Sequence, residues 1–426
     1  MKSFDVVIIG AGLAGLQCAK LLAQGDASVL LVDRKEDLTK GVHTTGIFVR
    51  KTFEDFDFPP QTLGKPIRKV TLYSPRLKSL DLTSEKEEFR VGRMSFLYKQ
   101  LLSECVDSGV EFMNGVRYAG AKVDDKTGNR GRINTGSDSD RMTRRAAALR
   151  IERQVATNPC SDSRSIVNLE KQGISIRVKT KVLIGADGAR SRVAKDLGLD
   201  ENREWIVGYE EVFEGVPLKG DARLHCFLDA DLAPGYLAWI TNDGEESHLG
   251  VGGYPSGFNP REALKIFKKE IASKFVNLKN AEKIETRGGR IPVGGVLKRI
   301  GNEHGMLIGD AAGAVSPLTA GGLDPCMRLS MFAAEIVAER LKTGSPEVLL
   351  NYTGRMFRAK FASRILMRRL LKVSSYQSLL ELGFKFLSSR PGRRVAEKIF
   401  FRRASFPDVE LIGRQVKATS QRVITR

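Results

Sequence analysis

Three glycines and one acid near the N-terminus have the types and spacing that bind a phosphate-bearing ligand. Gly10, Gly12 and Gly15 lie in the sequence GAGLAG, and Asp33 follows them. Gly10 permits a tight turn, Gly12 lets a pyrophosphate approach the backbone, and Gly15 lets a helix pack closely on a strand. The carboxylate of Asp33 can accept hydrogen bonds from ribose hydroxyls. This pattern indicates a dinucleotide site.

Two further stretches combine small residues with an isolated acid. The sequence IGADGARSRV, residues 184–193, contains Asp187, and IGDAAGAVSPLTAGG, residues 308–322, contains Asp310 as its one charged residue. The second stretch stays nearly free of charge in a chain whose formal net charge is +19. Such a stretch suits a backbone that lies along a large ligand.

The elements around these residues are predicted from their apolar patterns. Residues 4–9 and 28–33 are typical of buried parallel strands, and residues 12–24 between them are typical of a helix. This order is a βαβ unit, and its helix N-terminus faces the phosphates. We also predict short apolar strands that end in a turn at 181–188 and 305–313, and helices at 94–107 and 327–342.

Other segments have a different pattern. Residues 66–82 and 205–255 alternate apolar and polar residues and are rich in β-branched and aromatic residues, which indicates antiparallel strands. Residues 260–275 are predicted to form an amphipathic helix. Because these segments interrupt the βαβ segments, we expect a second domain that interleaves with the first along the chain.

The three motifs, in this order, resemble those of the FAD-binding fold shared by flavoprotein aromatic hydroxylases and geranylgeranyl reductases. The resemblance implies an α/β protein with a Rossmann-like FAD-binding domain, an interleaved antiparallel-sheet substrate domain and a C-terminal helical tail. The implied division is a FAD-binding domain at 1–60, 90–118, 169–200 and 295–345, a substrate domain at 61–89 and 201–294, a flexible insertion at 119–168 and a basic helical tail at 346–426.

The resemblance also implies roles for single residues. Asp310 would bind the ribityl chain of FAD, and Gly321 and Gly322 would let the backbone approach the isoalloxazine. Asp187 would lie near the FAD cleft. Arg93 matches an arginine that begins a helix and approaches the cofactor. The full set of expected FAD-binding residues is Gly10, Gly12, Gly15, Asp33, Arg34, Arg93, Asp187, Gly309, Asp310, Pro317, Gly321 and Gly322. Arg34 would lie over the adenine or be an exposed cation.

Two features favour the geranylgeranyl reductase branch. In the hydroxylases a histidine and a Pro-Pro pair usually follow Gly-Asp-Ala-Ala, whereas this chain has Gly313 and then Ser316 and Pro317. Residues 234–253 also resemble the Tyr-x-Trp segment of the reductases, with Tyr236 and Trp239 in the aromatic positions. We therefore expect these two rings to contact the substrate, or to pack between the sheet and the flavin.

The resemblance leaves the acid of the reaction open. Reductases of this kind often carry a cysteine near residues 43–46, where this chain has His43, Thr44, Thr45 and Gly46. His43 is a candidate proton donor, or a surface or core histidine. No second GxGxxG is present, so we expect electrons from transiently bound NAD(P)H or from a reduced carrier protein.

Three functions remain open at this stage. The first is a FAD-dependent reductase that saturates carbon–carbon double bonds of a prenyl or other lipid-like substrate by hydride transfer. The second is a FAD- and NAD(P)H-dependent monooxygenase that hydroxylates an aromatic or polyketide substrate. The third is a non-catalytic protein that binds a flavin or a prenyl group. The histidines and cysteines show no metal-binding spacing, so no metal site is expected.

The positive charge is concentrated in the tail. Residues 351–426 contain 18 Lys and Arg against 4 Asp and Glu. Within this tail, residues 356–389 place apolar residues at roughly helical spacing among the cations, as in helices that bind an anionic membrane surface. The alternative is a helix that packs on the FAD-binding domain with its cations in solvent. No nucleic-acid motif accompanies the charge.

The cellular location follows from the same features. The five cysteines are scattered and suit reduced thiols, and no long apolar run predicts a membrane span. We expect a cytoplasmic protein that can contact the inner face of a membrane peripherally.

Overall fold

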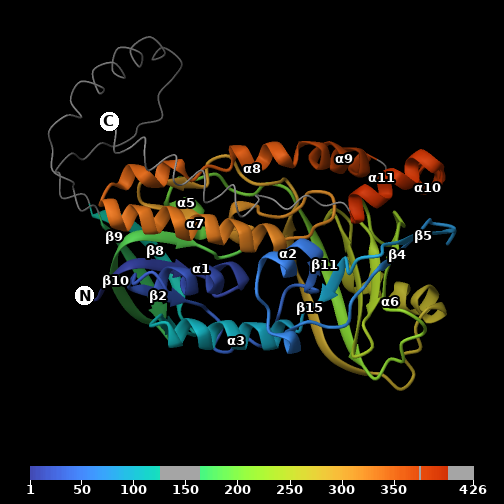
Figure 1. The fold of residues 1–426 in the computed structure, drawn as a ribbon, viewed down its shortest axis with the longest axis horizontal. Coiled ribbons are helices and arrows are strands. Elements are labelled where there is room, and N and C mark those ends of the chain that lie inside the picture. The colour runs from blue at the N-terminus through green and yellow to red at the C-terminus, as the bar shows by residue number, and fades with distance from the viewer. Residues whose placement is uncertain (125–163, 374–375, 402–426) are drawn as a thin grey trace, which may run out of the picture.

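The computed structural model describes residues 1–124, 164–373 and 376–401. Two large sheets form the framework (Figure 1). One lies with α1, α3 and α7 towards one end of the long axis, and the other lies with α6 towards the opposite end.

The first sheet has a parallel centre. Strands β7, β2, β1, β10 and β17 are neighbours in that order and run parallel, while β16, β9 and β8 add antiparallel pairs. The strands are β1 (Ser3–Ile9), β2 (Val29–Val32), β7 (Glu111–Met113), β8 (Arg117–Asp124), β9 (Arg164–Lys171), β10 (Ile174–Gly185), β16 (Gly301–Asn302) and β17 (Gly305–Leu307).

Helices cover the parallel strands, which explains their continuous apolar sequences. Helix α1 packs against both α3 and α7, and residues such as Val6, Val7 and Ile8 of β1 are fully buried. The elements are α1 (Leu13–Ala23), α3 (Met94–Asp107), α5 (Arg192–Asp196), η4 (Gly309–Ala312) and α7 (Leu323–Thr343). The carboxyl ends of β1, β2, β10 and β17 meet at one edge, where ligands bind in such sheets.

The second sheet combines two distant parts of the sequence. Its order is β15-β11-β14-β13-β12-β4-β5, antiparallel except for the pair β12–β4. Helix α6 packs on one face through the buried Phe267. The elements are β4 (Lys69–Tyr73), β5 (Ser79–Thr83), β11 (Trp205–Glu214), β12 (Arg223–Phe227), β13 (Ala238–Asn242), β14 (Glu246–Gly253), α6 (Pro260–Glu270) and β15 (Glu282–Pro292).

Several short elements complete the fold. A two-stranded sheet pairs β3 with β6 in antiparallel fashion. The remaining elements that precede α8 are β3 (Ile47–Val49), α2 (Arg50–Asp55), η1 (Pro60–Thr62), β6 (Phe89–Val91), η3 (Ala272–Lys274) and η5 (Pro346–Asn351).

The tail folds as several short helices that reach from one sheet to the other. In Figure 1 they continue from α8 to α11, and α10 and α11 end beside β4 and β5. Phe357 and Phe361 belong to the core around the first sheet, whereas Phe384 and Phe401 pack against the second sheet. The helices are α8 (Arg355–Lys360), α9 (Ala362–Val373), α10 (Gln377–Leu387) and α11 (Arg390–Phe400).

The expected fold class, an α/β protein with a Rossmann-like sheet, an antiparallel second sheet and a helical tail, is confirmed. One boundary differs from the sequence analysis. Residues 119–124 and 164–168, assigned there to a flexible insertion, lie in β8 and β9. β8 and β9 pair with each other although the rest of the insertion separates them in the sequence, so the pattern of either segment alone could not reveal the pairing. The remainder of the predicted insertion, residues 125–163, lies outside the described residues, and the proposed domain boundaries stay predictions.

Candidate functional site

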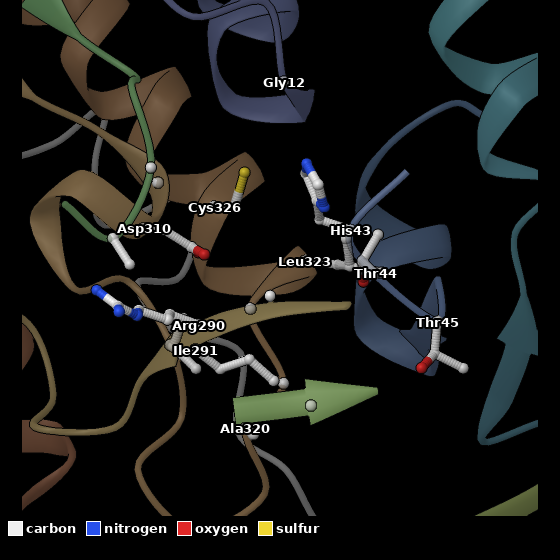
Figure 2. Close-up of a pocket in the computed structure, with 18 of the residues that line it drawn as sticks. Gly12, His43, Thr44, Thr45, Arg290, Ile291, Asp310, Ala320, Leu323 and Cys326 are labelled. Atoms are coloured by element: carbon white, nitrogen blue, oxygen red, sulfur yellow. The ribbon is translucent and has the colours of Figure 1, made fainter. Parts of the chain in front are cut away.

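A cavity of about 1150 Å³ lies between the two sheets. Its lining runs from the glycine turn after β1, past residues 309–323, to the face of the second sheet and the helices α9 to α11. Figure 2 shows Asp310, Arg290 and His43 reaching into this space from three separate segments. The volume exceeds the range of about 300–1,000 Å³ that is usual for drug-sized ligands, so a large ligand or two ligands can share it.

The first end of the cavity is the glycine turn. Gly10 has a φ of +107°, and a Cβ there would lie 2.3 Å from the carbonyl oxygen of Ala186. Gly12, which precedes α1, faces open space instead, with no atom within 4 Å of where its Cβ would be. Gly15 does not line the cavity, and a Cβ there would lie 1.9 Å from the carbonyl oxygen of Gly10, so a side chain has no room at this close approach. The turn therefore presents open backbone at the helix N-terminus, as a pyrophosphate requires.

Asp33 connects this turn to the end of β2. Its Oδ2 accepts a hydrogen bond from the backbone N–H of Ala11 at 2.7 Å, and its Oδ1 accepts one from that of Lys35 at 2.8 Å. Each oxygen keeps a second lone pair for a ribose hydroxyl. The neighbouring Arg34 is exposed and also lines the cavity.

The second motif is placed beside the turn by the parallel pairing of β1 with β10. Asp187 lines the cavity, and its Oδ2 accepts hydrogen bonds from the backbone N–H groups of Arg192, at 2.7 Å, and Val193, at 3.2 Å. Burial raises the pKa of Asp187, although these hydrogen bonds oppose the effect. Asp187 thus shapes the turn into α5 at the cavity edge.

The third motif forms the middle of the cavity. Gly309, Asp310, Gly321 and Gly322 all line it. Burial raises the pKa of Asp310 to about 6. Within the described part of the chain, no hydrogen bond to its carboxylate is present, so a ligand hydroxyl can donate to it. Pro317 is buried outside the cavity and packs near Gly295.

Arg93 does not line the cavity. Its guanidinium forms ion pairs with Asp243 at 2.8 Å, Glu245 at 2.7 Å and Glu246 at 3.5 Å, at the end of β13 and the start of β14. These acids come from a segment distant in sequence, so a motif match at Arg93 alone could not reveal them.

His43 lies on the cavity wall with Thr44 and Thr45 (Figure 2). The Nδ1 atom of its exposed ring lies 2.9 Å from the carbonyl oxygen of Gly288. Arg287 fixes the backbone of this segment, because it donates hydrogen bonds to the carbonyls of Thr44 and Thr45 at 3.0 and 3.3 Å.

Tyr236 and Trp239 both line the cavity on the face of the second sheet. Their ring centroids are 6.5 Å apart with an interplanar angle of 70°. The Tyr236 hydroxyl donates to the carbonyl of Thr319 at 2.8 Å, which connects the second sheet to the third motif. The indole of Trp239 donates to Glu210 at 2.8 Å.

Several cavity residues were not found by sequence reasoning. Arg290 at the end of β15 lines the cavity, and it also lies over the ring of Trp205, 5.3 Å from the centroid. Glu210 and Arg287 line the wall while they are only 2% and 4% exposed. The available signal was charge at inward positions of strands, as at Glu210 between the buried Ile206 and Val212.

The far end of the cavity is apolar. It is lined by side chains of the second sheet and of the tail helices, namely Leu72, Phe89, Leu224, Leu228, Leu237, Leu371, Leu387, Ile399 and Phe400. This end suits a hydrocarbon chain, because burial of such a chain removes apolar surface from water.

The residues present fit FAD by two observations. The open space at Gly12 accommodates a pyrophosphate at a helix N-terminus, and the carboxylate of Asp310 accepts hydroxyl donors. In that arrangement Asp33 would bind the adenosine ribose and Asp310 the ribityl chain.

The sequence comparisons agree with this site. Residues 139–369, more than half of the chain, match the FAD binding domain family, and residues 4–192 match the pyridine nucleotide-disulphide oxidoreductase family. The digeranylgeranylglycerophospholipid reductase of Methanocaldococcus jannaschii is 27% identical over 359 residues, which are 83% of this chain and 82% of the relative.

Solved structures share the fold. A geranylgeranyl bacteriochlorophyll reductase-like protein from Thermoplasma acidophilum has a TM-score of 0.74 at 18% identity and covers 98% of this chain and 99% of its own. A p-nitrophenol 4-monooxygenase from Pseudomonas putida has a TM-score of 0.59 at 15% identity and covers 98% of both chains. A reductase-like protein and a monooxygenase therefore share this fold. The residues of the site, and not the fold, must indicate which reaction the chain catalyses.

Proposed function

The chain belongs to the FAD-binding domain family, and we propose that it is a FAD-dependent reductase that saturates carbon–carbon double bonds of a prenyl, lipid-like substrate. The observation that carries the proposal is the continuity of the cavity. One end has the features of a dinucleotide site, and the other end is a wall of aliphatic and aromatic side chains. The similarity of the chain to the digeranylgeranylglycerophospholipid reductase described above supports the same proposal.

When it is bound and reduced, FAD supplies a hydride. The protein's contribution is to bind, orient and exclude water. Gly12 and Asp33 would position the adenosine diphosphate, and Asp310 the ribityl chain. Tyr236 and Trp239 would contact the substrate, and the apolar far end would bind its chain in a dry environment.

Electrons would come from NAD(P)H that binds transiently or from a reduced carrier protein. The aromatic monooxygenase remains the competing function, because the fold of the p-nitrophenol 4-monooxygenase is similar. The apolar wall favours the reductase, since a phenol would fill only a small part of the cavity.

We further propose that the tail helices contact an anionic membrane surface. Helices α9 and α10 expose Leu366, Leu370, Leu379, Leu382 and Phe386 to solvent, and these helices also carry exposed Arg369 and Lys385. Other residues of α9 to α11, such as Leu371 and Phe400, line the cavity. The helices thus lie between solvent and the apolar end, where a lipid chain would enter. No helix within the described ranges is long and apolar enough to cross a membrane.

The test is product analysis under anaerobic conditions. The purified protein is reduced with dithionite and mixed with a geranylgeranyl-chain glycerolipid, and the lipid is examined by mass spectrometry. We expect two added hydrogens per reduced double bond. A hydroxylated phenol formed with NAD(P)H and oxygen, together with an unchanged lipid, would establish the monooxygenase instead.

A further inference from the structure

A buried row of acid, imidazole and acid lies in the wall of the cavity. The Oε1 atom of Glu210 is 3.1 Å from Nδ1 of His248, and Nε2 of His248 is 3.2 Å from Oε2 of Glu246. The side chain of His248 is fully buried, that of Glu210 is 3% exposed, and that of Glu246 is 15% exposed. The row therefore leads from the cavity lining, at Glu210, towards solvent, at Glu246.

The strand register holds Glu210 in place. Glu210 of β11 and Trp239 of β13 both lie opposite Gly250 of β14. A Cβ at Gly250 would lie 2.1 Å from Cζ2 of Trp239, so the missing side chain lets the indole cross β14. The indole Nε1–H and the Thr45 hydroxyl both donate to Oε2 of Glu210. The carboxyl group is thus fixed beside Thr45, a cavity-lining residue that Figure 2 labels.

The electrostatics place a proton within this row. Burial by itself would lower the pKa of His248, but the carboxylates of Glu210 and Glu246 outweigh burial and raise it. Burial would likewise raise the pKa of Glu210, but His248 and Arg287 lower it. The imidazole is therefore protonated between two carboxylates over a wider pH range than a free histidine.

Two arginines face the row, and each is also paired with other carboxylates. Arg287 faces Glu210 from β15 at 3.7 Å and is paired with Glu285. Arg93 faces Glu246 at 3.5 Å and is paired with Asp243 and Glu245. Thr241 of β13 lies opposite His248 in the register. These groups determine how the row titrates.

We propose that Glu210 is the catalytic acid of the reduction and that His248 is the positioning residue that supplies its proton. The proposal rests on the proposed function. Saturation of one double bond breaks its π bond and forms two C–H bonds. One carbon receives the hydride described above, with its two electrons, and the other receives a proton from Glu210.

The proton balance closes through His248. Glu210 is ionised at rest, because His248 and Arg287 outweigh burial and lower its pKa, so the proton to be transferred resides on His248. This proton leaves Nδ1 of His248 for Glu210, which passes it to the substrate and returns to its ionised form. The imidazole, now neutral, regains a proton at Nε2, which faces Glu246, the most exposed member of the row, at an ion-pair distance but without a hydrogen bond in the resting structure. An imidazole can take up a proton on one nitrogen and release one from the other. A row that is only a structural ion pair would leave the reaction rate independent of Glu210, and the tests below distinguish these two roles.

The first test compares two glutamates that are adjacent in β11. Glu210→Gln keeps the shape of the side chain and removes its acid, whereas Glu211→Gln alters the next residue, which pairs with Lys268. We measure the single-turnover rate at which prereduced protein saturates a prenyl chain. Loss of a general acid should slow E210Q by about 100-fold or more, while E211Q retains the wild-type rate. Reduction of bound FAD by dithionite should be unchanged in both variants.

The second test begins with a measurement that needs neither FAD nor substrate. In ¹⁵N-histidine NMR of the apoprotein, the imidazole of His248 should titrate above the ordinary value of 6.5, and its pKa should fall in E210Q. In the wild type the saturation rate should decrease as pH rises through the same pKa. His248→Gln should be slow and lack this pH limb.

The outcomes separate the two proposals. If the wild type saturates no prenyl chain, the proposed function fails and the role of Glu210 fails with it. If the wild type saturates the chain and E210Q does so at the same rate and pH dependence, only the role of Glu210 is overturned. If E210Q does not fold, the His248→Gln rate and the wild-type titration decide, and a neutral His248 at pH 6 overturns the proposal.

Discussion

Asp310 illustrates how a single side chain can serve the cofactor site. It lines the middle of the cavity, and burial raises its pKa to about 6. A hydroxyl that donates to a carboxylate favours the ionised form, so a bound ribityl chain should lower this pKa. The affinity for FAD should therefore depend on pH.

The pKa of Asp310 is about 6 without FAD and should be lower when FAD is bound. Below pH 6 the apoprotein must lose a proton from Asp310 to bind FAD, so affinity should rise as pH increases towards 6 and then level off. Asp310→Asn should remove this dependence and weaken binding at pH 7 by about tenfold or more, because a hydrogen bond to a charged group is lost. Fluorescence titration of the apoprotein with FAD measures both effects. A flat wild-type profile between pH 4.5 and 7 would contradict the role of Asp310.

Gly12 provides a second prediction at this scale. A side chain there meets no protein atom, so Gly12→Val should fold normally and fail to bind FAD because it occupies the expected pyrophosphate position. Circular dichroism and the visible spectrum of the purified variant measure the two properties. A yellow G12V protein with wild-type flavin content would show that the pyrophosphate lies elsewhere.

The sequence predicted cavity residues where a short motif carried the geometry. Gly10, Gly12, Asp33 and Asp310 line the cavity because each follows a parallel strand whose end is set by local pattern. Glu210 and His248 could not be found in this way. Their proximity depends on the pairing of β11 with β14 and on the space at Gly250, and neither is local in sequence.

At the scale of elements, the central strands of the second sheet hold the cavity wall. β11, β14 and β13 lie side by side, and the indole of Trp239 crosses the middle strand at Gly250. This arrangement positions both Trp239 and Glu210. The packing around Gly250 should therefore affect stability and the environment of the indole together.

Gly250→Ala tests this packing. A methyl group 2.1 Å from the indole must displace Trp239, and such overpacking costs about 1–3 kcal/mol of unfolding free energy. Denaturant unfolding and tryptophan fluorescence should both change. Gly383→Ala in α10, where a Cβ meets nothing within 4 Å, is the control and should be neutral or up to about 1 kcal/mol more stable. Equal stability of G250A and the wild type would refute the packing account.

The tail helices give a prediction about membranes. Leu366 on α9 and Leu382 on α10 are 59% and 65% exposed. If they enter an anionic bilayer surface, replacing either with Asp should reduce binding to phosphatidylserine-containing vesicles by about tenfold, since burial of a leucine contributes about 1.5–3 kcal/mol. Ile266→Asp on α6, where Ile266 is 45% exposed, is the matched control. Vesicle sedimentation measures the binding, and equal binding by all variants would place the membrane contact elsewhere.

At the scale of the whole molecule, the two sheets and the tail enclose one continuous space. The sequence indicated the parallel sheet through its βαβ unit and the tail through its helical spacing. It could not show that β4 and β5 pair with β12, or that α11 lines the same cavity as Gly12, because these contacts join segments far apart in the chain. The shape of the cavity, with a cofactor end and an apolar end, is the basis of the proposed reduction.

The most direct test of this account is the absorbance of the flavin during an anaerobic reaction. The purified protein should be yellow, and dithionite should bleach it. Addition of a prenyl-chain lipid without oxygen should then restore the oxidised spectrum, with one equivalent of flavin reoxidised for each double bond saturated. A flavin that stays reduced with every prenyl lipid and is reoxidised only when oxygen and a phenol are added, or a protein that contains no flavin, would contradict the account.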